Sequence, residues 1–322
     1  FVDWDDYAYV INNELVRPAA DIVQTPINGP SEYTKSTADI FRTIVSLNYH
    51  PITILSMRWN NNVCSECING ISARPFILWN ILIHILNSML VLFFVFWLTN
   101  KNLLGSVLTA ALFALHPMHV ESVAWISERK DVLYVCFFML GLLSYTKYLE
   151  KLNRKWLALC MLLFILACLS KAMAVVFAPT LMLLYFWKQP VKNHIEALRN
   201  CFKLKPVLHL IPFFIVALIF GLIATNVQSG GDLNGLLIKT SDSVAINKFD
   251  TFSIIQRFQF ACYGFVEYIL KFFIPSNLCT FYPYPDQPTY DNSSWFGVVP
   301  FVVLILFTLT LYSLKYTRSI TF

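Results

Sequence analysis

The stretch PFILWNILIHILNSMLVLFFVFW, residues 75–97, lacks Asp, Glu, Lys and Arg throughout. An α-helix rises about 1.5 Å per residue, so roughly 20 apolar residues cross a hydrocarbon core of about 30 Å. The stretch is therefore predicted to be a membrane-spanning helix. The composition of the chain agrees, because 57% of its residues are hydrophobic and only 13% are charged, whereas about a quarter are charged in soluble domains.

Similar apolar segments recur along the chain, and about eight are expected in total. The others lie at 102–116, 131–149, 155–171, 174–187, 207–227, 258–274 and 296–314. Several are shorter than a full span, which indicates helices that are broken or buried against their neighbours. The sequence thus predicts an all-α polytopic membrane protein. Its net charge of +5 is scattered between the apolar segments, which suits orientation in a membrane and does not indicate nucleic-acid binding.

Residues 1–75 are more polar than the rest and contain several prolines and Asn-rich turn signals. Within them, TADIFRTIVSL at 37–47 has apolar residues at helical spacing. We predict a long first extracytoplasmic loop with an acidic motif and short interfacial helices, followed by a multi-span transmembrane bundle at 76–322. The first spanning helix is expected to lie outside this chain.

Basic residues predict which loops face the cytoplasm. Segments 147–155 and 187–205 are rich in Lys and Arg and are predicted to be cytoplasmic. Alternation of the spans then gathers the acidic loops on the opposite side, namely 1–75, 116–131, Ser170–Lys171 and 228–257. Strict alternation would put 275–294 in the cytoplasm. We expect the reverse, with 258–274 re-entrant or interfacial, or with one span miscounted.

Two groups of residues are candidates for acid–base or metal chemistry. Asp5 and Asp6 lie in an aromatic setting, and by themselves they are typical of a solvated loop with an N-cap aspartate. His116 and His119 are three positions apart with Glu121 close by, and such a set suits several divalent ions. The proline between the two histidines interrupts any helix. The spacing therefore favours a polar helix end and leaves a metal site as the alternative.

Several cations border the apolar segments. The run ERKD at 128–131 is either a solvated face or a group that binds a phosphate. Lys171 separates two apolar runs. At membrane depth such a residue is a functional candidate, whereas at the interface its ammonium simply reaches water. Arg257 precedes another apolar segment, and FYPYP at 281–285 suits a membrane surface or stacking on a sugar.

Longer motifs occur in the order found in a known family. They are FVDWDDYAYV (1–10), YHPITILS (49–56), ALFALHPMHVESVAWISERKDVLY (111–134), LSKAMAVVFAPTLMLL (169–184) and ACYGFVEYILKFFIPSNLCTFYPYP (261–285). Together they resemble the membrane region of the transmembrane and tetratricopeptide-repeat-containing proteins, and the bacterial branch is the closer match. The resemblance covers nearly the whole chain.

The resemblance implies a GT-C-type helix bundle and a glycosyltransferase activity. Enzymes of this superfamily take a sugar from a polyprenyl-phosphate carrier on the outer or lumenal side of a membrane, and the animal members of the family are O-mannosyltransferases. The expected reaction transfers mannose to Ser or Thr of an extracytoplasmic acceptor protein, with inversion. The expected partners are therefore the lipid bilayer, the polyprenyl-phosphate sugar and the acceptor protein. The expected location is a bacterial inner membrane with the site facing the periplasm, or the endoplasmic reticulum lumen in a eukaryote.

The same resemblance assigns roles to particular residues. The acidic motif of the first loop falls on Asp5 and Asp6, and one of the two is the expected general base. Cations that stabilise the charge growing on the leaving phosphate are expected at Lys171 and Arg129, which match family motifs, and at Arg257, which is expected at the same level of the membrane. Support for the acidic sugar site is expected from Glu121, Asp131, His116 and His119. No metal ligand is assigned, and a divalent ion is an alternative that the spacing does not favour.

The chain also departs from the family pattern. It shows no 34-residue repeat, so any tetratricopeptide repeats are expected beyond residue 322. Animal members have Gly-Arg-Ala-Asp where this chain has Glu-Arg-Lys-Asp at 128–131, which leaves the sugar and the acceptor open. The alternatives are a GT-C enzyme that glycosylates a lipid or a glycan, a non-catalytic scaffold, and a transporter. The charges at one membrane face and the absence of an evident inverted repeat count against a transporter.

Overall fold

The computed structural model describes residues 5–17, 35–63, 72–188, 200, 203–231, 238–239, 253–279 and 293–313. The chain divides into two compact units. The first comprises Phe1–Tyr185 and Leu204–Ala245, and the second comprises Phe186–Lys203 and Ile246–Phe322. Each unit is described by itself.

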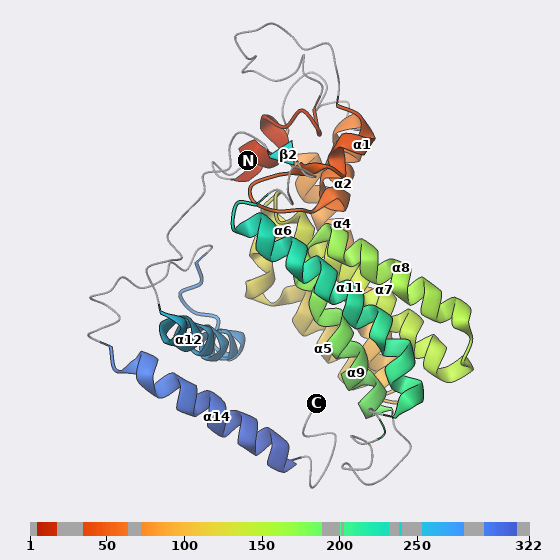
Figure 1. The fold of residues 1–322 in the computed structure, drawn as a ribbon, viewed down its shortest axis with the longest axis vertical. Helices are drawn as coiled ribbons and strands as arrows, with labels where there is room; N and C mark the ends of the chain where they lie inside the picture. Colours follow the sequence, from red (N-terminus) through yellow and green to blue (C-terminus); the bar gives the residue numbers. More distant parts are fainter. Residues whose placement is uncertain are drawn as a thin grey trace, which may run out of the picture. The chain divides into compact units, whose positions relative to one another are not determined.

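The first unit is a bundle of apolar helices (Figure 1). Its helices are α4 (Arg74–Leu98), α5 (Leu103–Leu115), α6 (Val120–Ala124), α7 (Arg129–Lys151), α8 (Arg154–Ser170), α9 (Phe177–Trp187) and α11 (Leu204–Gln228). Among the described residues, three helices are long and apolar enough to cross a membrane, namely α4, α7 and the 208–228 part of α11. The prediction of an all-α membrane helix bundle is confirmed.

A bend separates α5 from the short turn η3 (Pro117–His119) and α6 that follow it. The two parts meet at 50°, and only together are they long and apolar enough to cross a membrane. Pro117 has no N–H to continue the helix and disfavours helical geometry at the residue before it. His116 accordingly adopts an extended conformation, with φ −66° and ψ 130°. The short apolar segment predicted at 102–116 is thus the first part of a bent pair, with the geometry of a broken span or of a re-entrant loop.

The core of the bundle lies where α7, α8, α9 and α11 meet. Large buried side chains from these helices pack together there, with Tyr145, Phe164, Phe177 and Phe213 each at most 1% exposed. Gly141 of α7 allows the close approach, because a Cβ at this position would lie 2.8 Å from the Phe177 ring. Packing of this kind fixes the antiparallel α7–α8 pair, whose connection brings the start of α7 and the end of α8 to the same end of the bundle.

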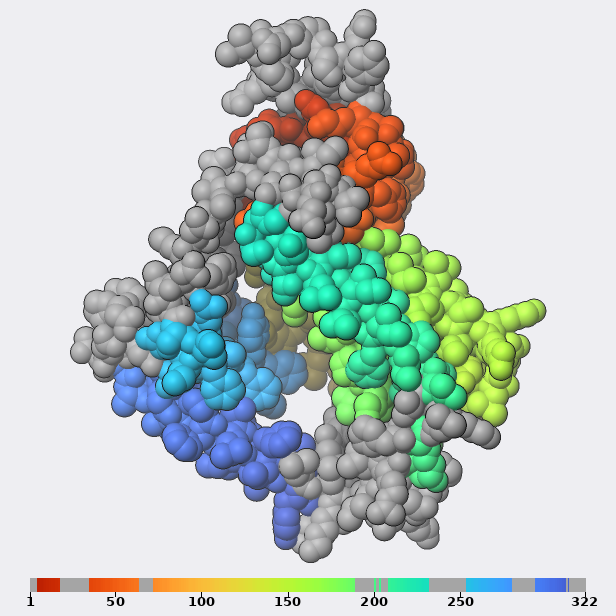
Figure 2. All heavy atoms as spheres, in the orientation of Figure 1, coloured from red at the N-terminus to blue at the C-terminus, as the bar shows by residue number. Residues whose placement is uncertain are grey.

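The N-terminal segment caps that end of the bundle. It contains η1 (Tyr7–Ile11), α1 (Thr37–Ile40), the strand β1 (Thr43–Ile44) and α2 (Pro51–Val63), and β1 pairs in parallel with β2 (Ile238–Lys239). Figure 2 shows the orange atoms of α1 and α2 resting on the bundle. Apolar side chains of the cap, including Tyr9, Leu15 and Met57, pack with Phe76 of α4 and with Ile126.

Of the stretch 37–47, whose apolar spacing suggested helix, only Thr37–Ile40 is helical. The capping box of Ser36 and Asp39 starts α1, but the chain then turns and enters β1 at Thr43. The Thr43 hydroxyl donates to the Asp39 carbonyl over 2.7 Å, and the β-branched run from Thr43 to Val45 favours extended backbone. The apolar residues that suggested a longer helix include Ile44 and Val45, which are buried within the cap instead.

The second unit contains α12 (Ile254–Phe273) and α14 (Trp295–Ser313), which pack through Cys262, Val266 and Val299. Ser253 and Gln256 form a capping box that starts α12. The predicted topology of 258–274 stays a prediction, and FYPYP at 281–285 lies outside the described residues.

Candidate functional site

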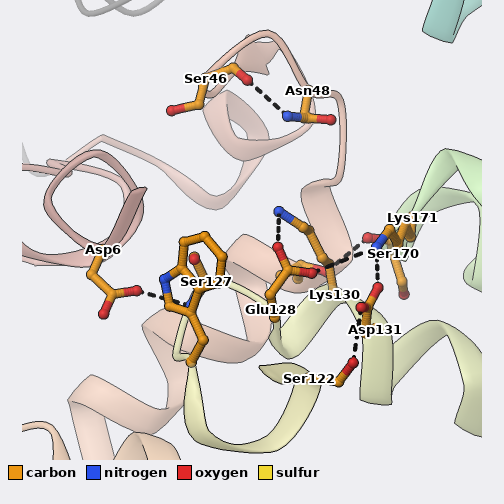
Figure 3. Close-up of polar contacts among 12 residues, drawn as sticks. Asp6, Ser46, Asn48, Ser122, Ser127, Glu128, Lys130, Asp131, Ser170 and Lys171 are labelled. Atoms are coloured by element: carbon orange, nitrogen blue, oxygen red, sulfur yellow. Dashed lines mark hydrogen bonds and ion pairs between the residues drawn. The ribbon is translucent and has the colours of Figure 1, made fainter. Parts of the chain in front are cut away.

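The acidic motif of the N-terminal segment contacts the turn that precedes α7. The Asp6 side chain is fully buried, and its Oδ1 accepts a hydrogen bond from the Ser127 backbone N–H over 3.0 Å (Figure 3). Asp5 is half-buried and lies close enough to Lys130 to interact with its charge. Two stretches separated by more than a hundred residues therefore meet at one end of the bundle.

Two lysines and two carboxylates form a network beside this contact. Lys130 Nζ lies 2.8 Å from Glu128, and Lys171 Nζ lies 3.5 Å from the other oxygen of the same carboxylate. Lys171 also forms an ion pair with Asp131, whose second oxygen accepts from the Ser122 hydroxyl over 3.0 Å. Figure 3 shows Glu128 joined to both ammonium groups. The four formal charges cancel, and the side chains are between 11% and 26% exposed.

The positions of these residues follow from helix ends. Lys171 stops α8 in an extended conformation, with φ −155°, and the turn η4 (Ala172–Val176) begins after it. Glu128 is the N-cap of α7. Burial raises the pKa of the Glu128 carboxyl, although Lys130 opposes the shift. A carboxylate at a helix N-terminus with ammonium partners nonetheless has the favourable charge sign for that place.

A small pocket of about 20 Å³ opens beside the network. Its polar lining includes Lys130, Lys171, Ser170, Asn48 and His50. Its apolar wall comes from α11, through Phe220, Ile223, Ala224 and Val227. Both lysine ammonium groups and apolar side chains therefore line this pocket.

His50 and Tyr9 form a stacked pair at the pocket. Their ring centroids lie 4.9 Å apart with an interplanar angle of 4°, and the Lys130 ammonium lies 5.1 Å from the centre of the Tyr9 ring. Burial, together with the charges of Lys130 and Lys171, lowers the pKa of His50 to about 3. Burial raises the pKa of Tyr9 to about 12. Both rings are therefore uncharged at neutral pH.

Arg129 faces away from this pocket and into the protein. Its side chain is 1% exposed and donates to Asn80 Oδ1 at 2.9 Å, Asn60 Oδ1 at 2.8 Å and the Phe76 carbonyl at 2.7 Å. The guanidinium therefore ties α7 to α2 and α4. A phosphate could reach it only by displacing these acceptors, and its predicted role as a phosphate ligand stays a prediction.

His116 and His119, which were predicted to support the sugar site, occupy the bend between α5 and α6. His116 Nδ1 accepts from the Met118 N–H over 3.3 Å, and His119 packs on Phe113 with ring centroids 4.7 Å apart. Glu121 lies close enough to Glu128, Asp131 and Lys171 to interact with their charges. Among the described residues, no group of three or more His, Cys, Asp or Glu side chains is arranged to hold a metal ion.

Arg257 belongs to α12 of the second unit, and its predicted role likewise stays a prediction. Sequence reasoning did not single out His50 or Ser127. The motif YHPITILS contained a signal for His50, because a histidine directly before the proline that starts a helix is placed at a helix N-terminus. The role of Ser127 rests on its backbone N–H, which leaves no trace in residue type.

The fold and the site define a helical membrane protein that gathers lysines and carboxylates at one end of its bundle. Comparison with curated proteins finds distant relatives that share one name. Over 147 residues, 46% of the chain, it is 31% identical to the protein O-mannosyl-transferase TMTC1 of Mus musculus. Over 187 residues, 52% of the chain, it is 28% identical to the protein O-mannosyl-transferase TMTC4 of Homo sapiens.

A third relative, the protein O-mannosyl-transferase Tmtc1 of Drosophila melanogaster, is 32% identical over 40% of the chain. These matches span only 15%, 24% and 14% of the lengths of the three relatives. No protein-family model matches the chain, and no solved structure gives a significant match. The chain is thus distantly similar in sequence to animal proteins named O-mannosyl-transferases.

Proposed function

We propose that this chain is the membrane part of a glycosyltransferase of the GT-C superfamily, of the bacterial type. It transfers a sugar, first of all mannose, from a polyprenyl-phosphate carrier to a Ser or Thr hydroxyl of an extracytoplasmic protein. The observation that carries the proposal is that Asp5 and Asp6 lie at the same end of an apolar helix bundle as Lys130 and Lys171. The distant similarity to proteins named O-mannosyl-transferases supports it. The proposed location is an inner membrane, with this end facing the periplasm.

The donor phosphate lies in the pocket between Lys130 and Lys171 in this proposal. Each ammonium has three N–H donors, and the ion pairs with Glu128 and Asp131 hold both ammoniums in place beside the pocket. Negative charge grows on the phosphate as the sugar leaves, and preplaced cations stabilise that charge. The apolar side chains of α11 that line the same pocket offer a surface for the first isoprene units.

The sugar is transferred in a single displacement. The acceptor hydroxyl oxygen forms a bond to the sugar C1 while the bond from C1 to the phosphate oxygen breaks, and the electron pair of that bond leaves with the phosphate. The hydroxyl proton passes to a carboxylate, and general-base help of this kind is worth about 10²–10⁴ in rate. Attack opposite to the leaving group inverts the anomeric centre.

Asp5 is the better candidate for the base, and Asp6 for its positioning residue. Asp6 is fully buried and is committed to the Ser127 N–H, so it anchors the motif to α7. Asp5 is half-buried and can meet a substrate without breaking that anchor. Its charge interaction with Lys130 links the base to the cation that holds the leaving phosphate.

The proposal is tested by sugar transfer in membranes that contain the full-length protein, with a polyprenyl-phosphate mannose donor and mass spectrometry of the modified product. Asp5→Asn is expected to lower turnover at least 100-fold with the fold intact, and Lys171→Met to weaken donor binding. Lys155→Met is the matched control, because Lys155 is exposed at the opposite end of α8.

Wild-type turnover in both Asp5→Asn and Asp6→Asn would remove the two aspartates from the reaction. Unchanged donor affinity in Lys171→Met would remove the phosphate contact. Mannose on a lipid or a glycan, with none on protein, would overturn the proposed acceptor while leaving the transferase activity in place.

A further inference from the structure

His50 is held rigidly at the entrance of α2. Its carbonyl accepts from the backbone N–H groups of Thr53 at 3.1 Å and Ile54 at 3.3 Å, which fixes the main chain at the start of the helix. The stack on Tyr9 fixes the plane of the ring. The side chain is only 3% exposed. A ring fixed by its main chain and by one stacked neighbour is prepared to make a directional contact.

Both nitrogens of this ring are buried and have no hydrogen-bond partner in the described part of the chain. Such atoms are rare, because a buried donor or acceptor without a partner is destabilising and native structures satisfy nearly all of them. His50 also lines the pocket that Lys130 and Lys171 line. A ring with unmet hydrogen-bonding capacity therefore borders the pocket of the proposed donor phosphate.

The surroundings of the ring decide which kind of group it meets. A neutral imidazole carries one N–H donor and one acceptor nitrogen. The ammonium groups of Lys130 and Lys171, although each is paired with a carboxylate, disfavour a third positive charge on the ring, in line with its strongly lowered pKa. A ring with so low an affinity for protons is a poor base, but it is still a good donor to an anionic oxygen.

We propose that the neutral His50 side chain donates a hydrogen bond to an oxygen of the phosphate bound between Lys130 and Lys171. This inference rests on the proposed function, because it takes the pocket to be the site of the donor phosphate. His50 would then bind the phosphate without adding charge to the pocket, while the two lysines supply the charge. The contact also orients the phosphate relative to α2 and to the cap that carries Asp5.

The test measures binding of farnesyl phosphate, a short polyprenyl phosphate, to the full-length protein in nanodiscs. His50→Phe keeps the ring stack on Tyr9 and removes the N–H, whereas His50→Gln keeps an N–H donor. The expected result is a dissociation constant raised about 10- to 100-fold in His50→Phe and raised no more than a few-fold in His50→Gln. His84→Phe, in α4 and outside the pocket lining, is the matched control and should bind like the wild type.

Farnesol, which lacks the phosphate, separates a hydrogen bond from packing. It should bind His50→Phe and the wild type equally, and an equal loss of both ligands would overturn the inference. Wild-type affinity of His50→Phe for farnesyl phosphate would also overturn it. If Lys171→Met loses affinity in that case, the donor site stands and His50 alone is excluded. If Lys171→Met binds normally, the proposed donor site itself fails.

A measurement on the wild type tests the inference even if the His50 variants do not fold. With ¹⁵N-labelled histidine, farnesyl phosphate should shift one pair of imidazole resonances, and that pair should be missing in His50→Gln. Inorganic phosphate should produce a smaller shift at equal concentration if the lipid chain contributes to binding. Unchanged imidazole resonances on addition of farnesyl phosphate would overturn the inference without any substitution at His50.

Discussion

Replacing Arg129 with methionine separates two roles for this residue, namely a tie between helices and a ligand for phosphate. Three charge-assisted hydrogen bonds of 2.7–2.9 Å join the guanidinium to Asn80, Asn60 and the Phe76 carbonyl. Each such bond is worth about 1.5–3 kcal/mol, which gives a gross loss of roughly 4.5–9 kcal/mol. Removing the buried charge recovers part of its desolvation cost, so the net loss of stability is expected to be about 3–5 kcal/mol.

The assay is thermal unfolding of the purified protein in nanodiscs, followed by tryptophan fluorescence. A loss of this size corresponds to a midpoint lower by about 10 °C, since 1 kcal/mol shifts a unit of this size by roughly 2–4 °C. Arg129→Lys should be nearly as destabilising, because one ammonium cannot span acceptors on both α2 and α4. Asn60→Ala should lower the stability less in the Arg129→Met background than in the wild type, because Asn60 Oδ1 has already lost the Arg129 hydrogen bond in that background.

Two results would refute the role of Arg129 as a tie between helices. If Arg129→Met unfolds at the wild-type temperature but binds the donor more weakly, the guanidinium is a phosphate ligand and the tie between helices is unimportant. If Arg129→Lys retains both stability and activity, charge alone is what position 129 supplies. Either outcome would reverse the assignment drawn from the contacts.

Three further predictions use other parts of the first unit. Gly141→Ala should destabilise the protein by about 1–3 kcal/mol through overpacking, because the new Cβ would lie 2.8 Å from the buried Phe177 ring. The unfolding midpoint should fall accordingly, and an unchanged midpoint would show that the ring moves aside without cost. Leu152→Gly should raise the midpoint slightly and leave activity unchanged, since Leu152 ends α7 with φ 51° and is 74% exposed. Acidification should destabilise the wild type more steeply than His50→Phe. The pKa of His50 is about 3 in the folded state against 6.5 in the unfolded state, so the unfolded state binds an extra proton between these two values. Stability is therefore lost as the pH falls from 6.5 towards 3, by at most about 1.4 kcal/mol per pH unit. Parallel melting curves of the two proteins across this pH range would contradict that prediction.

The apolar runs predicted the helices well because membrane helices must satisfy their own backbone hydrogen bonds and need long apolar stretches to do so. The segment predicted at 75–97 corresponds to α4, and that at 155–171 to α8. The same reasoning failed over 37–47, where the segment lies at the cap and β-branched residues with side-chain contacts override helical spacing.

The candidate site was harder to predict than the helices. Arg129 and Lys130 are adjacent in sequence and carry the same charge, but successive residues of a helix point about 100° apart. Arg129 consequently reaches α2 and α4, while Lys130 lines the pocket. Sequence spacing could not choose between them, because the choice depends on which face of α7 packs against the cap. The contact of Asp6 with a backbone N–H at Ser127 was invisible for a related reason, since any residue type supplies that donor.

The long separation between contacting residues has a consequence for biosynthesis. The backbone N–H that Asp6 accepts from lies 121 residues later in the chain. The Ser170 carbonyl, to which the Thr53 hydroxyl donates over 2.9 Å, lies 117 residues after Thr53. Neither contact can form before its later residue has been synthesised. At translation speeds of about 5–20 residues per second, that wait lasts roughly 6–24 s. During this interval the acidic segment stands beside the membrane with its carboxylates still in water. This end of the bundle therefore closes only after the α7–α8 hairpin has been inserted, and a delay in inserting that hairpin would prolong exposure of the N-terminal segment to proteases.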